Sequence, residues 1–109
     1  MKPLFLPLKA QFFDAFVDGS KTTEYRLYGA RWNEGTCKVG RPVLLSRGYG
    51  KRFRRWGQIE SFYTSKDVTE SPAFRACYPL ARKEALAACI KIRLTGDFPK
   101  PFDIGDEDV

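Results

Sequence analysis

The 109-residue chain contains no histidine and only three cysteines, Cys37, Cys77 and Cys89. The missing histidine excludes a histidine-based metal site and a histidine general base. The cysteines are 40 and 12 residues apart, a spacing that fits no zinc pattern, and an odd number cannot form a closed set of disulfides. We therefore expect no metal and no cofactor, and reduced, mostly buried thiols as in a cytoplasmic protein.

Long apolar runs are also missing. The longest, residues 85–90, is much shorter than the ~20 residues that a membrane span requires. No secretory-signal pattern opens the chain, so we expect a cytoplasmic location and no membrane contact. The sequence does contain 43% hydrophobic and 15% aromatic residues, which is enough for one hydrophobic core of ordinary domain size.

Charge is unevenly distributed along the chain, whose 19 basic and 13 acidic residues give a net charge of +6. Residues 97–109 carry five acidic groups and one basic group, a net charge of −4, which leaves +10 for residues 1–96. Pro99, Pro101 and Gly105 interrupt regular structure there. We expect one folded domain over residues 1–96, followed by a flexible acidic tail over residues 97–109.

The densest basic segment spans residues 47–55, where glycines and aromatic residues are interleaved with five cations. A basic loop is often merely solvated, but this mixture favours binding of a polyanion such as RNA. Tyr49, Phe53 or Trp56 could stack on unpaired bases, although Trp56 leads into an expected strand and suits a core position equally well. The side chains expected to follow a phosphate backbone are Arg47, Lys51, Arg52, Arg54 and Arg55.

The apolar pattern predicts five strands and two helices. Strands are expected near residues 4–8, 22–28, 41–46, 56–63 and 86–94, the last with one face in the core. Phe12, Phe13, Phe16 and Val17 have helical spacing and are followed by Gly19, a natural helix stop. Ser71-Pro72 predicts the start of a short helix. With no βαβ rhythm, this order predicts an α+β fold, a small mixed β-barrel with one longer and one short helix.

Residues 19–26, Gly-Ser-Lys-Thr-Thr-Glu-Tyr-Arg, join the first helix to the second strand. Lys21 is expected at the corner between them. Strand alternation places Glu24 and Arg26 on one face and Leu27 on the other, and Leu27 indicates that its own face meets the core. Glu24 and Arg26 can therefore converge on one ligand together with Lys21. The alternative is an ordinary surface ion pair worth less than about 1 kcal/mol.

The pattern Gly19-x-Lys21-x-x-Glu24-x-Arg26, placed after an amphipathic helix and followed by Val-Gly-Arg-Pro-Val-Leu-Leu at residues 39–45, resembles the ASCH family. The resemblance extends over about residues 3–95. It implies a PUA-like β-barrel that binds RNA or a nucleotide, with a cleft beside the barrel lined by Lys21, Glu24 and Arg26. In such a cleft Arg26 could contact a phosphate or a base edge.

The resemblance also implies an alternative, because some small ASCH proteins are acetylcytidine amidohydrolases or ribonucleases. The amidohydrolase motif runs lysine-threonine-x-threonine. Lys21 and Thr22 match it, but Glu24 stands where the second threonine belongs and Thr23 is one position away. A catalytic set would then be Lys21, Thr22 and Glu24, with Asp67 or Glu70 as a further carboxylate. A metal-independent ribonuclease would instead use Lys21 as acid or base and Arg26 to stabilise the phosphorane.

A third interpretation is a regulatory module that binds proteins. In that case the basic loop meets an acidic partner, and the acidic tail competes for the same surface. The sequence does not distinguish a monomer from an oligomer.

Overall fold

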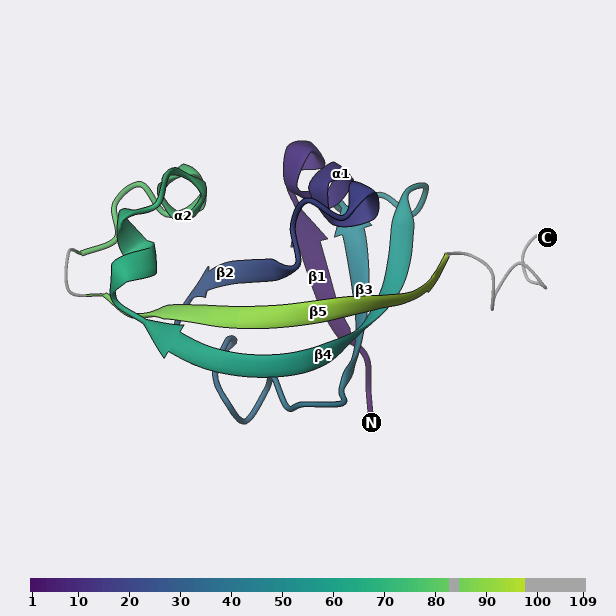
Figure 1. The fold of residues 1–109 in the computed structure, drawn as a ribbon, viewed down its shortest axis with the longest axis horizontal. Coiled ribbons are helices and arrows are strands. Elements are labelled where there is room, and N and C mark those ends of the chain that lie inside the picture. The colour runs from purple at the N-terminus through teal and green to yellow at the C-terminus, as the bar shows by residue number, and fades with distance from the viewer. Residues whose placement is uncertain (83–84, 98–109) are drawn as a thin grey trace.

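The computed structural model describes residues 1–82 and 85–97, and these form a five-stranded mixed sheet curved into a half-barrel (Figure 1). The sheet order is β1-β3-β4-β5-β2, with β1 parallel to β3 and every other neighbouring pair antiparallel. The strands are β1 (Leu4–Leu8), β2 (Thr23–Leu27), β3 (Pro42–Arg47), β4 (Arg54–Ser65) and β5 (Ala87–Asp97). The expected α+β fold, a small mixed barrel of five strands with one longer and one short helix, is confirmed.

The first helix, α1 (Ala10–Asp18), lies at one end of the half-barrel (Figure 1). It buries Phe13 and Phe16, the apolar stripe that the sequence indicated. Gly19 ends the helix with φ 87°, a left-handed conformation that glycine adopts without steric cost, and its N–H bonds to the Phe16 carbonyl. The predicted helix stop is confirmed, and it sets the direction in which the chain enters β2.

The short helix α2 (Pro72–Cys77) follows the 3₁₀ turn η1 (Asp67–Glu70) at the opposite end of the sheet (Figure 1). The Ser71 hydroxyl accepts the Phe74 N–H over 3.1 Å, and Pro72 occupies the first helical position, where its missing N–H costs nothing. No helix in the described part of the chain is both long and apolar enough to cross a membrane.

The main core fills the inside of the half-barrel and is closed by α1. Its buried members come from every strand but β2, from α1 and from the loop before β3: Leu6, Leu8, Phe13, Phe16, Trp32, Cys37, Val43, Leu45, Ile59, Ala88, Ile90 and Ile92.

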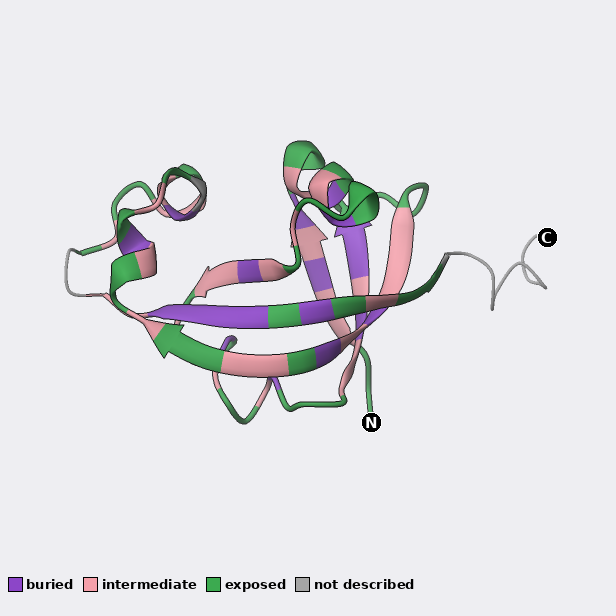
Figure 2. Ribbon diagram, in the orientation of Figure 1, coloured by how far each residue is buried: buried purple, intermediate pink, exposed green. Residues whose placement is uncertain are grey.

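A second cluster covers the outer face of the sheet at the α2 end. Phe74 packs there against Ala87 and Cys89, with Tyr25 at its edge. The expectation that only one face of the last strand meets a core is therefore wrong for its first half, since residues 87–90 are all buried (Figure 2). The cause is the η1–α2 segment, whose cover over the sheet strand alternation alone does not reveal.

The basic segment divides between strand and loop. Arg47 ends β3, Arg54 and Arg55 begin β4, and only residues 48–53 connect the two strands. Asp97, taken from the sequence as the first residue of the acidic tail, is the last residue of β5 and lies opposite Arg55. Residues 98–109 lie outside the described residues.

Candidate functional site

The corner between α1 and β2 brings together the three charged side chains of the motif. The Lys21 N–H bonds to the Ala15 carbonyl over 3.1 Å, which fixes the turn after α1. The Lys21 Nζ lies 3.6 Å from Glu24 Oε1, and the Arg26 Nε donates to Glu24 Oε2 over 2.8 Å. Glu24 therefore pairs with a cation on each of its oxygens.

Glu24 is buried, with only 3% of its surface exposed, whereas Leu27 is 37% exposed. The prediction that the Leu27 face meets the core is thus wrong for the main core, because Ile90 and Ala88, which stand opposite Glu24 and Arg26 on β5, belong to it. On the Leu27 face, Tyr25 packs against the second cluster instead. A buried carboxylate is costly unless it is paired, and here two cations pair with it. The polarity of the side chains alone predicted the wrong buried face of β2, because Lys21 and Arg26 neutralise the charge of Glu24 and allow it to be buried.

Arg26 connects the two edge strands of the sheet. Its Nη2 donates to the Pro7 carbonyl on β1 over 2.5 Å, while its Nε holds Glu24. The guanidinium also lies over the ring of buried Trp32, 4.8 Å from the centroid. These three contacts fix the position and orientation of the guanidinium before any ligand arrives.

Lys21 sits among aromatic rings. Its Nζ lies 4.9 Å from the centroid of Tyr25, 5.2 Å from that of Phe12 and 5.7 Å from that of Phe16. The side chain is 14% exposed, so the ammonium is held chiefly by the rings and by Glu24.

Arg26 lines a hollow of about 270 Å³, called the Arg26 hollow below. Tyr49 stands at its rim with 79% of its surface exposed, and Lys9 adds a second cation. The Tyr49 ring is 6.2 Å from that of Phe5. The complete lining is Pro7, Leu8, Lys9, Arg26, Gly48 and Tyr49.

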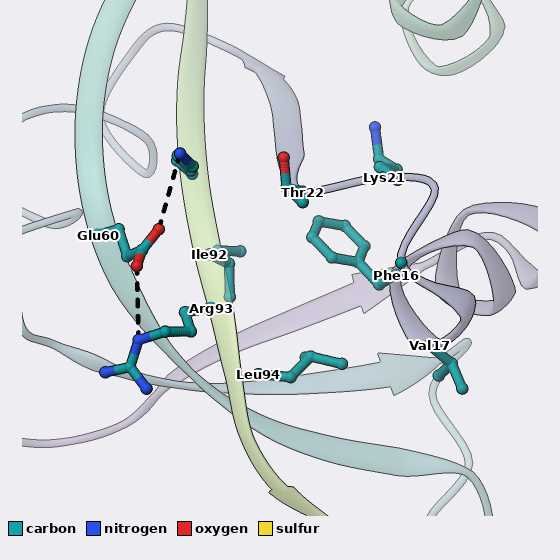
Figure 3. Close-up of a pocket in the computed structure, with 10 residues that line it drawn as sticks. Phe16, Val17, Lys21, Thr22, Glu60, Ile92, Arg93 and Leu94 are labelled. Carbon is teal, nitrogen blue, oxygen red and sulfur yellow. Dashed lines mark ion pairs between the residues drawn. The ribbon is translucent and has the colours of Figure 1, made fainter.

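Lys21 lines a different hollow of about 320 Å³, called the Lys21 hollow (Figure 3). Phe16 and Val17 from α1 form one side of it, and Ile92 and Leu94 from β5 form another. Its remaining lining residues are Gly19, Thr22, Glu60, Lys91 and Arg93. The three motif residues are therefore in contact, because buried Glu24 pairs with both Lys21 and Arg26. Lys21 and Arg26 nevertheless line separate hollows.

The cations of the basic segment have different environments. Arg54 holds the loop together, because its Nε donates to the Gly50 carbonyl over 3.0 Å and its Nη2 to the Tyr49 carbonyl over 3.3 Å. Arg47 pairs with Asp14 at 3.2 Å, and the Arg55 Nη1 donates to the Arg54 carbonyl over 2.8 Å.

The loop itself presents three exposed residues in succession, Lys51, Arg52 and Phe53, with the Arg52 guanidinium 5.5 Å from the Phe53 ring centroid. Trp56 lies within β4, opposite Leu44 and Gly96, and is only partly exposed. Tyr49 and Phe53 are therefore the aromatic residues of this segment that are open to a ligand.

Several lining residues were not singled out from the sequence. Lys9 precedes α1, Pro7 contributes a carbonyl, and Lys91 and Arg93 are the exposed alternate residues of β5. The last two had a sequence signal, since two cations alternate with Ile90, Ile92 and Leu94. Of the residues considered for a hydrolase, Thr22 lines the Lys21 hollow, whereas Asp67 and Glu70 lie in η1 near α2. Among residues 1–82 and 85–97 no group of three metal-ligating side chains occurs.

Comparison with known proteins gives similarity at the level of structure. No family model and no curated protein matches the chain. The solved structure of hypothetical protein PH0355 is 14% identical, covering 86% of this chain and all of that one, with a TM-score of 0.61. A single-residue variant of ZmASCH from Zymomonas mobilis is 13% identical, covering 88% of this chain and 76% of that one, with a TM-score of 0.58. The chain therefore has the fold of the ASCH protein ZmASCH, and the resemblance noted in the sequence is confirmed at the level of the fold.

Proposed function

We propose that the protein is an ASCH-type module that binds single-stranded RNA or a nucleotide in the Arg26 hollow. The observation that carries this proposal is the fixed Arg26 guanidinium, held by Glu24 and Trp32, in a hollow whose rim bears the exposed ring of Tyr49. An oriented guanidinium can bind a phosphate or a base edge without first losing side-chain entropy.

The exposed aromatic ring supports the choice of RNA over a small inorganic anion. Tyr49 is 79% exposed on a loop that also carries Lys51 and Arg52. Unpaired bases stack on such rings with about 1–3 kcal/mol each, and neighbouring cations attract the phosphate backbone. The hollow and the loop together offer both kinds of contact that a single strand requires.

The proposal is tested with a fluorescein-labelled oligouridylate of eight nucleotides, followed by fluorescence anisotropy at fixed salt. Loss of one stacked base by Tyr49→Ala should weaken binding by about 5- to 160-fold. Tyr49→Phe keeps the ring and serves as the matched control. K51Q/R52Q should weaken binding more than K38Q/K66Q, which removes the same charge from exposed positions outside the two hollows.

Two results would contradict the proposal: no binding of the oligonucleotide by the unaltered protein, or equal binding by Tyr49→Ala and Tyr49→Phe. Circular dichroism of each variant separates a loss of contacts from a loss of fold. Since Tyr49 is exposed, we expect these spectra to coincide.

A hydrolase is the second candidate, because Lys21 and Thr22 line one hollow. In an amidohydrolase, water would cleave the amide of acetylcytidine to give cytidine and acetate. Released acetate that disappears in Lys21→Met would support this candidate, and cleavage of the labelled oligonucleotide on a gel would support a ribonuclease instead. Binding without either product favours the module.

A further inference from the structure

Outside the motif, Glu60 on β4 and two cations on β5 form a surface cluster beside the Lys21 hollow (Figure 3). The Lys91 Nζ lies 3.9 Å from Glu60 Oε1, and the Arg93 Nε lies 3.5 Å from Glu60 Oε2. The three side chains are 40–55% exposed. Ion pairs this exposed to water contribute little to the stability of the fold. A more highly charged anion such as a phosphate can therefore replace the Glu60 carboxylate at these cations.

The adjoining hollow combines this charge with an apolar wall. Lys91 and Arg93 share a single carboxylate, Glu60, so these three side chains carry a net charge of +1. Lys21 also lines the hollow, but its ammonium pairs with Glu24. Val17 remains 41% exposed at the wall, although it is apolar. A ligand that is apolar in one part and anionic in another matches this lining.

The Lys21 hollow also continues toward the basic segment. Val17 lines a second hollow of about 540 Å³ together with Phe53 and two cations, Arg47 and Arg55. Asp14 and Asp18 line the same hollow, and Arg47 pairs with Asp14 at 3.2 Å, so this lining carries no net charge. A strand that leaves the 48–53 loop past α1 would therefore meet its next net positive charge on β5.

We propose that Lys91 and Arg93 are a second phosphate-binding site for the RNA strand, with the neighbouring base against Val17 and Leu94 in the Lys21 hollow. Glu60 competes with the phosphate for both cations and so lowers the affinity of this site. This inference rests on the proposed function, because it concerns the same strand farther along its path.

Oligouridylates of four and ten nucleotides test the site by anisotropy in a salt series. The short one is expected to occupy the Arg26 hollow, and the long one to reach β5 as well. K91Q/R93Q should weaken binding of the long oligonucleotide about tenfold and lower its salt slope by about 0.7, the contribution of one phosphate contact with a single strand. Binding of the short oligonucleotide should stay unchanged.

Glu60→Gln should change the affinity in the opposite direction. It removes the carboxylate that competes for Lys91 and Arg93 and leaves both cations in place, so the long oligonucleotide should bind about two- to threefold more tightly. A misfolded variant would not gain affinity in this way. K38Q/K66Q again serves as the control of equal charge, and K91R/R93K should retain binding because the cations remain.

Equal effects of K91Q/R93Q and K38Q/K66Q on the long oligonucleotide would overturn the second site while leaving the proposed function intact. So would an unchanged or lower affinity in Glu60→Gln. A protein that binds neither oligonucleotide would contradict the proposed function, and this site with it.

Discussion

The Arg26 Nη2 donates a hydrogen bond to the Pro7 carbonyl, although their strands β2 and β1 lie at opposite ends of the sheet order. One side chain thus spans the seam of the half-barrel, with Trp32 beneath it. The same guanidinium pairs with buried Glu24. Closure of the fold and orientation of the candidate site therefore depend on one residue.

Arg26→Met should destabilise the protein by about 2–4 kcal/mol, because it leaves the Glu24 carboxylate buried with only Lys21 at 3.6 Å and removes the bond across the seam. Urea unfolding measures the loss. The double variant E24M/R26M removes the buried carboxylate as well. Its loss of unfolding free energy should therefore be smaller than the sum of the losses in Glu24→Met and Arg26→Met. A loss below about 0.5 kcal/mol in Arg26→Met would mean that the seam is held by other contacts.

Most of the fold could be predicted because its signals are local. Gly19 ends α1 through its own backbone conformation, and Ser71 caps α2 through its own hydroxyl. The first strand was predicted at residues 4–8, and β1 has those bounds. The others shift by a few residues at their ends, where strand pairing rather than composition decides how far the ladder extends.

The faces of β2 and β5 were harder to predict because they depend on distant partners. Glu24 is buried only because Arg26 and Lys21 pair with it, and Arg26 in turn needs a carbonyl 19 residues earlier in the chain. Cys89 is buried by Phe74, which arrives with α2. No periodicity within a single strand contains this information.

The role of Arg54 illustrates the same limit at the site. Its position among five cations predicts a phosphate contact, which stays a prediction, and the structure adds that its guanidinium donates to the carbonyls of Tyr49 and Gly50. Composition identifies a basic loop, but it does not separate a cation that shapes the loop from one that faces solvent.

Gly57 in β4 has atoms of β3 and β5 packed closely against it, and Gly57→Ala should be strongly destabilising. A Cβ there would lie 2.7 Å from the Ile92 Cγ2 and 3.1 Å from both the Arg93 carbonyl oxygen and the Leu45 Cδ1. Backbone and buried side chains must shift to admit it, at a cost of about 1–3 kcal/mol in urea unfolding.

Gly96→Ala is the matched control for this substitution. Gly96 also lies in a strand, yet a Cβ there meets no atom within 4 Å, so we expect a change within about 0.5 kcal/mol. Equal losses in the two variants would show that strand glycines matter through chain entropy and not through the close approach at Gly57.

The buried thiols predict how stability changes at alkaline pH. Burial raises the pKa of both Cys37 and Cys89 above the ordinary value of 9.0. A raised acid pKa means that the folded protein keeps a proton which the unfolded chain releases. The stabilisation is therefore complete below the unfolded-state pKa of about 9 and is lost as the pH rises through the raised folded-state pKa of each thiol.

Urea unfolding at pH 8, 9 and 10 measures this slope. C37A/C89A should be less stable at pH 8, because each substitution leaves a cavity, but its stability should fall less steeply between pH 9 and pH 10. Cys77 is partly exposed, so Cys77→Ala should keep the slope of the unaltered protein and controls for loss of a thiol as such. A slope that is the same in all three proteins would assign the alkaline loss to groups other than the buried thiols.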